Sequence, residues 1–295
     1  METSVAPTNA EFLASVATKS DGAALRGDYT QADAQYVVTQ NWAAYTEEEH
    51  ELWRKLYARQ AALLPGRACD EFVEALNKMD ASGGIPILAT TSEALFAATG
   101  WVIVAVPGLI PEHSFFDHLA NRRFPVTVWL RTPEEFDYIV EPDIFHDFFG
   151  HVPLLFNPVF ADYMQRYGQG GLKAMRLGGL DELARLYWYT VEFGLINTPQ
   201  GLRIYGAGIL SSGGEVEYCL KPGTASRHIR LDIERCLRTL YKIDSYQESY
   251  FVIDSYQQLF DGTAPDFTPI YEKLKHMDVL PANTLLATEI ELLPH

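Results

Sequence analysis

The chain has little cysteine and no long apolar run. Its cysteines, Cys69, Cys219 and Cys236, are widely spaced and form no C-x-x-C pair, so neither a disulfide framework nor a cysteine metal site is predicted. The most apolar run covers residues 101–106 and is far too short to span a bilayer. The N-terminal residues include no basic segment followed by a long apolar one. No signal peptide is therefore predicted, and we expect a cytoplasmic protein.

Positive charge is also scarce. Lysine and arginine total 23 against 39 aspartates and glutamates, which gives the 295 residues a formal net charge of -16. Such a field repels the phosphates of nucleic acids and of anionic lipids, so we expect neither a nucleic acid nor a membrane as a partner. Apolar residues are abundant at 47%, and aromatic residues make up 13%. This composition indicates a globular protein with a sizeable core.

The pattern of apolar and turn-forming residues predicts an α+β fold, predominantly helical, with a few short strands in a single domain. A capping box of Thr46 and Glu49 begins the first helix, and Pro65 ends it. Further helices are predicted over residues 69–79, 92–98, 142–149, 180–196 and 226–241, with a short one inside 107–123. Strands are predicted over residues 101–106, 124–130 and 203–220, and residues 248–260 are predicted as a strand followed by a helix. Strands and helices do not alternate regularly, so a doubly wound sheet is not expected.

Two histidines lie in an apolar stretch between residues 141 and 155. His146 and His151 are five positions apart, with Phe148 and Phe149 between them. On an ideal α-helix this spacing separates the side chains by about 140°, so both reach one metal ion only if the helix ends near the second. Gly150 favours such an end. A histidine in an apolar stretch is more often a hydrogen-bonded core residue, so the spacing permits a metal site without requiring one.

A carboxylate lies in the most apolar predicted helix. Glu192 has Trp188, Tyr189, Leu195 and Ile196 as neighbours on adjacent turns. Burying it costs several kcal/mol unless it is paired, protonated or bound to a cation. In one interpretation, the carboxylate reaches solvent at the rim of the core or forms an ion pair with a residue from another part of the chain. The other joins Glu192 to the two histidines in a facial triad, which is typical of non-haem Fe(II) sites that use oxygen.

Three motifs then carry a resemblance to a known family. They are PDIFHDFFGHVPLL at 142–155, YWYTVEFGL at 187–195 and YGAGILSSGGEVEYCL at 205–220. In these motifs and their spacing, the chain resembles the tetrahydropterin-dependent aromatic amino acid hydroxylases over about residues 28–261. It is most similar to the short bacterial members that act on phenylalanine.

The resemblance implies a reaction, its cofactors and a metal site. It places Fe(II) on His146, His151 and Glu192. It implies a tetrahydropterin cofactor (tetrahydrobiopterin or a bacterial analogue) and O2 as co-substrate. The implied reaction is a monooxygenase step that converts L-phenylalanine to L-tyrosine. The same chemistry on tryptophan or tyrosine is the alternative, because a few side chains of similar size decide between these substrates.

The resemblance also implies two sets of binding residues. The expected pterin-binding residues are Gly108, Leu109, Ile110, Phe115, Asp147, Ala184 and Tyr187. The expected substrate-binding residues are Arg131, Tyr138, Pro142, Trp188, Phe193, Gly208, Ser211 and Ser212. Phe115 would stack on the pterin, and the fork of Arg131 suits the substrate carboxylate. From the residues alone, Phe115 as a core residue and Arg131 as a solvated one remain alternatives. Ile139 stands where the family has threonine, and Asp147 stands where animal members have glutamate.

The expected organisation follows from the same resemblance. Residues 1–27 form a flexible N-terminal tail, and 28–261 form the iron- and pterin-binding catalytic domain. Residues 262–295 form a C-terminal segment, and because it has no sustained heptad pattern we expect no tetramerisation helix and a monomer.

Two other classes of protein stay open. His146-Asp147 is also the HD dipeptide of metal phosphohydrolases, which would need a further histidine such as His113 or His118. The other alternative is a non-catalytic binding domain in which the buried histidines and carboxylate form a polar network.

Overall fold

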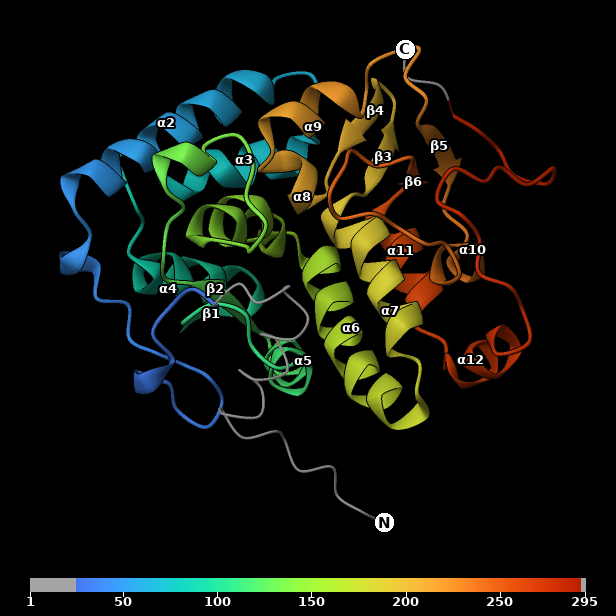
Figure 1. The fold of residues 1–295 in the computed structure, drawn as a ribbon, viewed down its shortest axis with the longest axis horizontal. Coiled ribbons are helices and arrows are strands. Elements are labelled where there is room, and N and C mark those ends of the chain that lie inside the picture. The colour runs from blue at the N-terminus through green and yellow to red at the C-terminus, as the bar shows by residue number, and fades with distance from the viewer. Residues whose placement is uncertain (1–24, 293–295) are drawn as a thin grey trace.

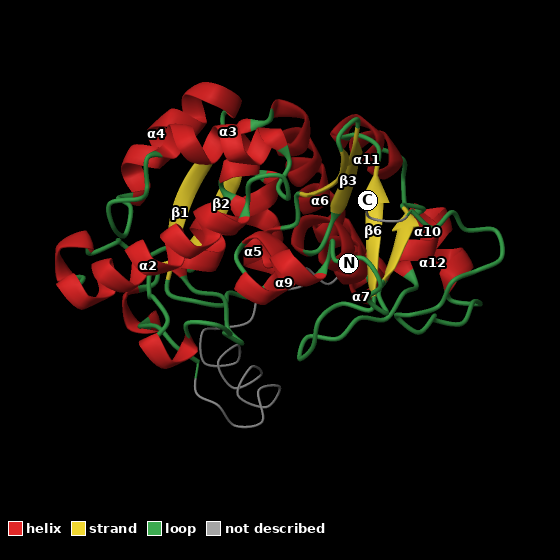
Figure 2. Cartoon of the chain, turned by 90° about the horizontal axis from the view of Figure 1, so that it is seen from above, coloured by secondary structure: helices red, strands yellow, loops and turns green. Residues whose placement is uncertain are grey.

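Short strands and many helices form the fold. The computed structural model describes residues 25–292, and residues 1–24 of the predicted tail lie outside that range. The strands form two small sheets. Figure 1 shows these sheets on opposite sides of the molecule with helices between and around them, and Figure 2 shows the same separation from above. The predicted α+β class with predominantly helical content is confirmed.

The N-terminal elements largely follow the sequence pattern. In order they are η1 (Tyr29–Gln31), η2 (Trp42–Ala44), α2 (Glu47–Leu63), α3 (Asp70–Met79) and α4 (Leu88–Thr99). The predicted capping box is present: Thr46 Oγ1 accepts the Glu49 N–H at 3.2 Å, and Glu49 Oε2 accepts the Thr46 N–H at 2.8 Å. α4 is longer than predicted and ends at Gly100, whose φ of 74° suits a residue without Cβ.

A parallel strand pair follows. Its elements are β1 (Val102–Val106), α5 (Glu112–Ala120) and β2 (Arg123–Thr127). β1 pairs with β2 in parallel, so the chain must cross between their ends, and α5 makes that crossing. The strand predicted over 124–130 is therefore shifted, since β2 begins at Arg123 and ends at Thr127.

Two segments are π-helices, which the sequence did not predict. They are η4 (Phe145–His151) and η6 (Trp188–Glu192), the second of which continues α7 (Leu180–Tyr187). The predicted end at Gly150 is wrong, because η4 runs through His151. The helix predicted over 180–196 is too long, because η6 ends at Glu192. A Cβ on Gly194 would lie 2.3 Å from Thr190 O. Only a glycine allows the chain to turn into a strand there.

A mixed sheet of four strands forms the other side. The strands are β3 (Leu195–Thr198), β4 (Gly201–Ile204), β5 (Arg227–Arg230) and β6 (Ser249–Ile253), in the order β4-β3-β6-β5. β3 and β4 form an antiparallel pair, and the other pairs are parallel. The strand and helix predicted over 248–260 are confirmed as β6 and α11 (Tyr256–Thr263). Two predictions are wrong: 203–220 holds α8 (Ala207–Leu210) and α9 (Gly213–Tyr218), and 226–241 begins with β5 before α10 (Ile233–Leu237).

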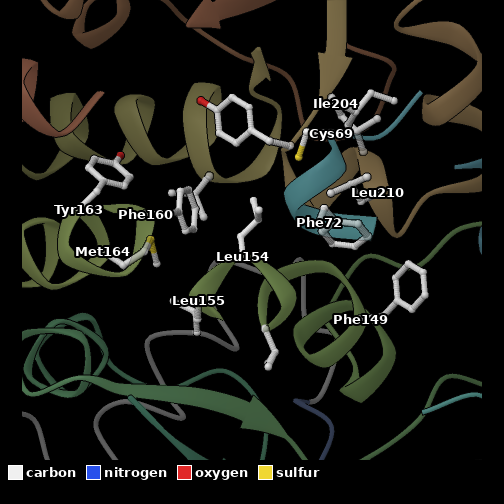
Figure 3. Packing of buried hydrophobic residues seen from close by; sticks show 14 of the residues in the cluster. Cys69, Phe72, Phe149, Leu154, Leu155, Phe160, Tyr163, Met164, Ile204 and Leu210 are labelled. Carbon is white, nitrogen blue, oxygen red and sulfur yellow. The ribbon is translucent and has the colours of Figure 1, made fainter. Parts of the chain in front are cut away.

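The longest helix was not predicted. α6 (Pro158–Leu177) begins at Asn157, whose side chain caps it. Two of its glycines permit close packing on α5: a Cβ on Gly168 would lie 2.4 Å from Ala120 N, and one on Gly171 would lie 2.0 Å from the Phe116 ring. Figure 3 shows apolar side chains of α6, α3 and the segment before α6 meeting in one core.

The remaining elements are short. They are η3 (Pro133–Glu135), η5 (Pro153–Phe156) and α12 (Thr268–Leu274). Between residues 25 and 292, no helix is long and apolar enough to cross a membrane.

Candidate active site

The two predicted histidines and the predicted glutamate come together. His146 Nε2 lies 3.2 Å from His151 Nε2 and 3.6 Å from Glu192 Oε2, and His151 Nε2 lies 3.1 Å from Glu192 Oε1. Within residues 25–292, this is the one cluster of three or more His, Cys, Asp or Glu side chains with ligand atoms this close together. Two imidazoles and one carboxylate around a single point fit a divalent iron ion.

The π-helical backbone explains why a spacing of five works. In a π-helix the hydrogen bonds run from residue i to i+5, so residues five apart lie on nearly the same side. η4 therefore brings His146 and His151 onto one face without ending between them. η6 ends at Glu192 and presents its carboxylate to that face. Both segments that supply the cluster thus have the same rare geometry, which is frequent at functional sites.

A serine fixes the tautomer of His146. The Ser211 hydroxyl donates its proton to Ala207 O at 2.8 Å, and Ser211 Oγ lies 2.9 Å from His146 Nδ1. Because the hydroxyl proton is already used, Nδ1 must carry the hydrogen and donate it to Ser211. The lone pair of His146 is then on Nε2, which faces His151 and Glu192, as a metal ligand requires.

The charges in the cluster favour a cation. Burial lowers the pKa of His146 to about 4, so this imidazole is neutral at pH 7. Burial also opposes a charge on His151, but the Glu192 carboxylate outweighs it and raises the pKa of His151. Burial opposes ionisation of Glu192, yet His151 and His146 lower its pKa. An ionised carboxylate in a buried site attracts positive charge, and an iron ion would supply it.

Arg131 is buried beside the cluster and is held by Asp143. Asp143 Oδ2 accepts from Arg131 Nε at 2.8 Å and from Arg131 N at 3.0 Å, and its Oδ1 accepts from Nη2 at 3.0 Å. Oδ1 also accepts the His146 N–H at 2.9 Å. The same carboxylate therefore orients the arginine and the first turn of η4. One edge of the guanidinium is occupied, so a ligand can only meet the remaining N–H groups of Arg131.

A pocket of about 700 Å³ opens onto the cluster. All eight predicted substrate-binding residues line it, together with His146, Glu192 and Tyr187. The ring of Trp188 lies 4.7 Å from that of Phe193, and both belong to the wall. Sequence reasoning missed another part of the wall, namely Glu215 and residues 243–247. Glu215 lies inside the motif 205–220 but was not singled out there, and nothing in the sequence marks 243–247, which belong to no motif and lie far along the chain from Glu192.

Of the predicted pterin-binding residues, only Tyr187 lines this pocket, and the ring of Phe115 is connected to the cluster through that of Tyr187. The Phe115 ring lies 5.9 Å from the Tyr187 ring, which lies 6.2 Å from the His151 ring. Asp147 points to β2, where its Oδ2 accepts the Thr127 N–H at 2.8 Å. Burial raises the pKa of Asp147 to about 7.

Other members of the predicted pterin set show different degrees of exposure. Gly108 is buried, Leu109 and Ala184 are exposed, and Ile110 lies between these extremes. Leu109 O already accepts from the Tyr29 hydroxyl at 2.7 Å. The backbone of this segment is thus tied to the N-terminal region.

The histidines that a phosphohydrolase would need are elsewhere. His118 is buried in α5, where its Nε2 lies 2.9 Å from Gln35 O. Among the described residues, neither His118 nor His113 belongs to the metal-binding cluster, and Asp147 does not belong to it either. The geometry therefore favours the facial triad over an HD-type site.

Fold and site together define a class of protein. The chain matches a family model described as biopterin-dependent aromatic amino acid hydroxylase over residues 24–269. The chain belongs to this family. Among its relatives, the phenylalanine-4-hydroxylase of Ralstonia nicotianae is 60% identical over 255 residues, which cover 86% of this chain and 79% of the relative. The phenylalanine-4-hydroxylase of Chromobacterium violaceum is 61% identical over 231 residues, covering 78% and 77%.

Solved structures are similar over almost the same span. One is phenylalanine hydroxylase from Chromobacterium violaceum with bound iron(III) and the oxidised cofactor 7,8-dihydrobiopterin. It has a TM-score of 0.85 at 54% identity, covering 88% of this chain and 94% of the solved one. The iron- and phenylalanine-bound structure of that enzyme has a TM-score of 0.85 at 55% identity, covering 89% and 96%.

Proposed function

We propose that this chain is an Fe(II)- and tetrahydropterin-dependent monooxygenase that converts L-phenylalanine and O2 to L-tyrosine. Membership of the family supports the cofactors and the reaction class. The relatives named phenylalanine-4-hydroxylase support the choice of substrate. The observation that carries the proposal is the facial triad at the base of an aromatic pocket that also contains a buried arginine.

His146, His151 and Glu192 would hold the iron, and the three residues leave coordination positions open for other ligands. When bound, iron and reduced pterin supply the activation of O2. The protein holds the imidazole lone pair of His146 toward the metal through Ser211. The triad is largely buried, and a substrate in the pocket would cover the parts of His146 and Glu192 that still face solvent.

The amino-acid substrate would lie in the pocket with its carboxylate on Arg131. Asp143 occupies Nε and one hydrogen of Nη2, so the carboxylate would meet the remaining N–H groups. Trp188 and Phe193 would contact the aromatic ring, and their planar faces suit such a guest. Tyr138, Pro142, Gly208, Ser211 and Ser212 complete the proposed contact set.

The pterin would lie on the other side of the cluster, near Phe115 and Tyr187. Phe115 would stack on the pterin, and the backbone of 108–110 would bond its edge. Ala184 and Asp147 complete the set, with Asp147 as a hydrogen-bonding partner of the pterin through water. The proximity of the rings of Phe115, Tyr187 and His151 supports this arrangement.

The proposed organisation is a monomer in the cytoplasm. Residues 28–261 would form the catalytic domain, and 262–295 would add no tetramerisation helix. The short α12 in that segment is in keeping with this proposal. Light scattering after size exclusion should give the mass of one chain, and a tetramer mass would refute the proposal.

An assay with product identification tests the proposed reaction. The iron-loaded protein is supplied with O2, a reduced pterin and each aromatic amino acid in turn. We expect tyrosine from phenylalanine as the main product, with one iron per chain. A His146→Ala variant, which lacks one ligand, is the control. Hydroxylated tryptophan or tyrosine as the main product would favour the alternative substrates, and no product from any of them would refute the proposal.

A further inference from the structure

A loop that no motif marks forms one wall of the substrate pocket. Residues 243–247 line the pocket between α10 and β6. Across the pocket mouth, the Tyr138 hydroxyl donates to Ile243 O at 3.3 Å. Most side chains of the loop are exposed, but Gln247 is buried. The position of this loop therefore shapes the pocket, and Gln247 fastens it to the protein.

The Gln247 side chain joins the loop to the pocket aromatic Trp188. Its Nε2 donates to Lys242 O at 3.0 Å and to Ser245 O at 3.4 Å, which closes the loop on itself. Its Oε1 accepts from Trp188 Nε1 at 2.9 Å. The indole also stacks on Tyr241, with ring centroids 4.3 Å apart and planes at 15°. The orientation of Trp188 is thus coupled to the position of the loop.

A buried carboxylate holds Gln247 in turn. Glu215 belongs to α9, and its side chain accepts two hydrogen bonds on one oxygen. Oε1 accepts the Gln247 N–H at 3.1 Å and the Tyr250 hydroxyl proton. The residue is 4% exposed, and within residues 25–292 no arginine, lysine or histidine forms an ion pair with it. A buried carboxylate without a cation is costly, and core stability alone would be better served by an apolar residue.

We propose that Glu215 is a positioning residue for the hydroxylation. By accepting the Gln247 backbone N–H, it holds the loop 243–247 against the pocket. Through the side-chain amide of Gln247, it also holds Trp188 in the orientation that receives the aromatic ring. The role in catalysis rests on the proposed function, whereas the anchoring of the loop does not.

The chain offers variants that separate positioning from stability. Glu215→Ala removes the acceptor from both donors. Glu215→Gln keeps an oxygen in the place of Oε1, so it can accept both bonds. Glu289 is a matched control, because its side chain is only 10% exposed and pairs with Arg235 away from the pocket. Glu289→Ala should lower the melting temperature without an effect on the loop.

Hydrogen exchange of the iron-loaded protein without substrate tests the anchoring. In Glu215→Ala we expect the amides of 242–248 to exchange faster by on the order of tenfold, since a buried donor loses its acceptor. Glu215→Gln should stay within about twofold of wild type, and Glu289→Ala should show unchanged exchange in this segment. Unchanged exchange in Glu215→Ala would overturn the proposal, whatever substrate the protein uses.

Steady-state kinetics test the consequence for the substrate. In Glu215→Ala we expect the phenylalanine KM to rise by about fivefold to tenfold, with less tyrosine formed per pterin oxidised, because Trp188 is poorly oriented. The pterin KM and the iron content should be unchanged, and Glu215→Gln should behave as wild type. A phenylalanine KM and coupling within about twofold of wild type would overturn the positioning role.

Two further outcomes are decisive. If Glu215→Ala does not fold, Gln247→Met replaces it, because that variant removes the acceptor of the Trp188 Nε1 hydrogen bond. Gln247→Met should give the same kinetic change, and wild-type kinetic values in this variant would overturn the proposal. If the wild-type protein hydroxylates no aromatic amino acid, the proposed function fails, and the exchange data alone uphold or overturn the anchoring role.

Discussion

Replacing Ser211 with alanine should weaken iron binding although the three ligands stay in place. The hydroxyl accepts from His146 Nδ1 at 2.9 Å and donates to Ala207 O at 2.8 Å. Without it, nothing in this contact selects the tautomer that has its lone pair on Nε2. Loss of a partner that orients a ligating histidine typically weakens metal affinity by about 10- to 100-fold. We expect a change in that range for Ser211→Ala.

The expected change in stability follows from the iron affinity. With free iron at about 100 times the wild-type Kd, bound metal stabilises the folded state by about 2.7 kcal/mol. A tenfold weaker Kd reduces this contribution to about 1.4 kcal/mol. For a chain of this size, 1 kcal/mol corresponds to roughly 2 °C in Tm. The iron-dependent increase in Tm should thus shrink by about 2–3 °C.

Two measurements check this prediction. Competition with a coloured chelator gives the iron Kd, and thermal unfolding with and without iron gives the metal-dependent part of Tm. Subtracting the Tm of the iron-free variant from that of its iron-bound form removes the direct effect on Tm of losing a buried hydroxyl. Ser212→Ala is a matched control, because Ser212 lines the same pocket but its hydroxyl caps α9 and contacts no predicted iron ligand. An iron Kd for Ser211→Ala within about twofold of wild type would refute the reasoning.

Three further predictions concern the iron, the pterin and the substrate. His146→Ala should lose most of its iron and all tyrosine formation, and metal analysis showing one iron per chain would contradict the triad. Phe115→Ala should raise the pterin KM several-fold, since stacking on one ring contributes about 1 kcal/mol. An unchanged pterin KM would favour the alternative that Phe115 is a core residue. Arg131→Lys keeps the charge but loses the fork that Asp143 holds. It should raise the phenylalanine KM about tenfold, or about 1.4 kcal/mol, and leave the pterin KM unchanged; an unaltered phenylalanine KM would place the carboxylate elsewhere.

Local sequence patterns predicted the parts of the fold that local physics controls. The capping box of Thr46 and Glu49 satisfies two orphan N–H groups within a few residues, so it could be found from the sequence. The run of aromatic and β-branched residues in β6 was equally visible. The π-helices were not, because an i+5 hydrogen-bond pattern has no clear signature in composition. A prediction that assumed an ideal α-helix therefore placed the end of η4 at Gly150, before His151.

The glycine-rich motif of 205–220 was misread for another reason. A Cβ on Gly206 would lie 2.4 Å from Glu192 O, and one on Gly208 would lie 3.1 Å from Glu192 Oε2. These glycines allow the chain to pass close to the predicted iron ligand, and this need depends on tertiary packing. The glycine-rich sequence was predicted as a strand over 203–220, whereas in the structure these two glycines lie at the start of a short helix, α8.

Asp143, His146 and Asp147 of the apolar stretch 141–155 each have a partner that offsets the cost of burial. Asp143 pairs with Arg131, and Asp147 accepts the Thr127 N–H. The Nδ1 of His146 is satisfied by Ser211. After these bonds, the unused lone pairs of His146, His151 and Glu192 converge on one point. The hydrogen bond to Ser211 thus fixes the direction of the His146 ligand before a cation arrives, so little further ordering of that imidazole is needed when iron binds.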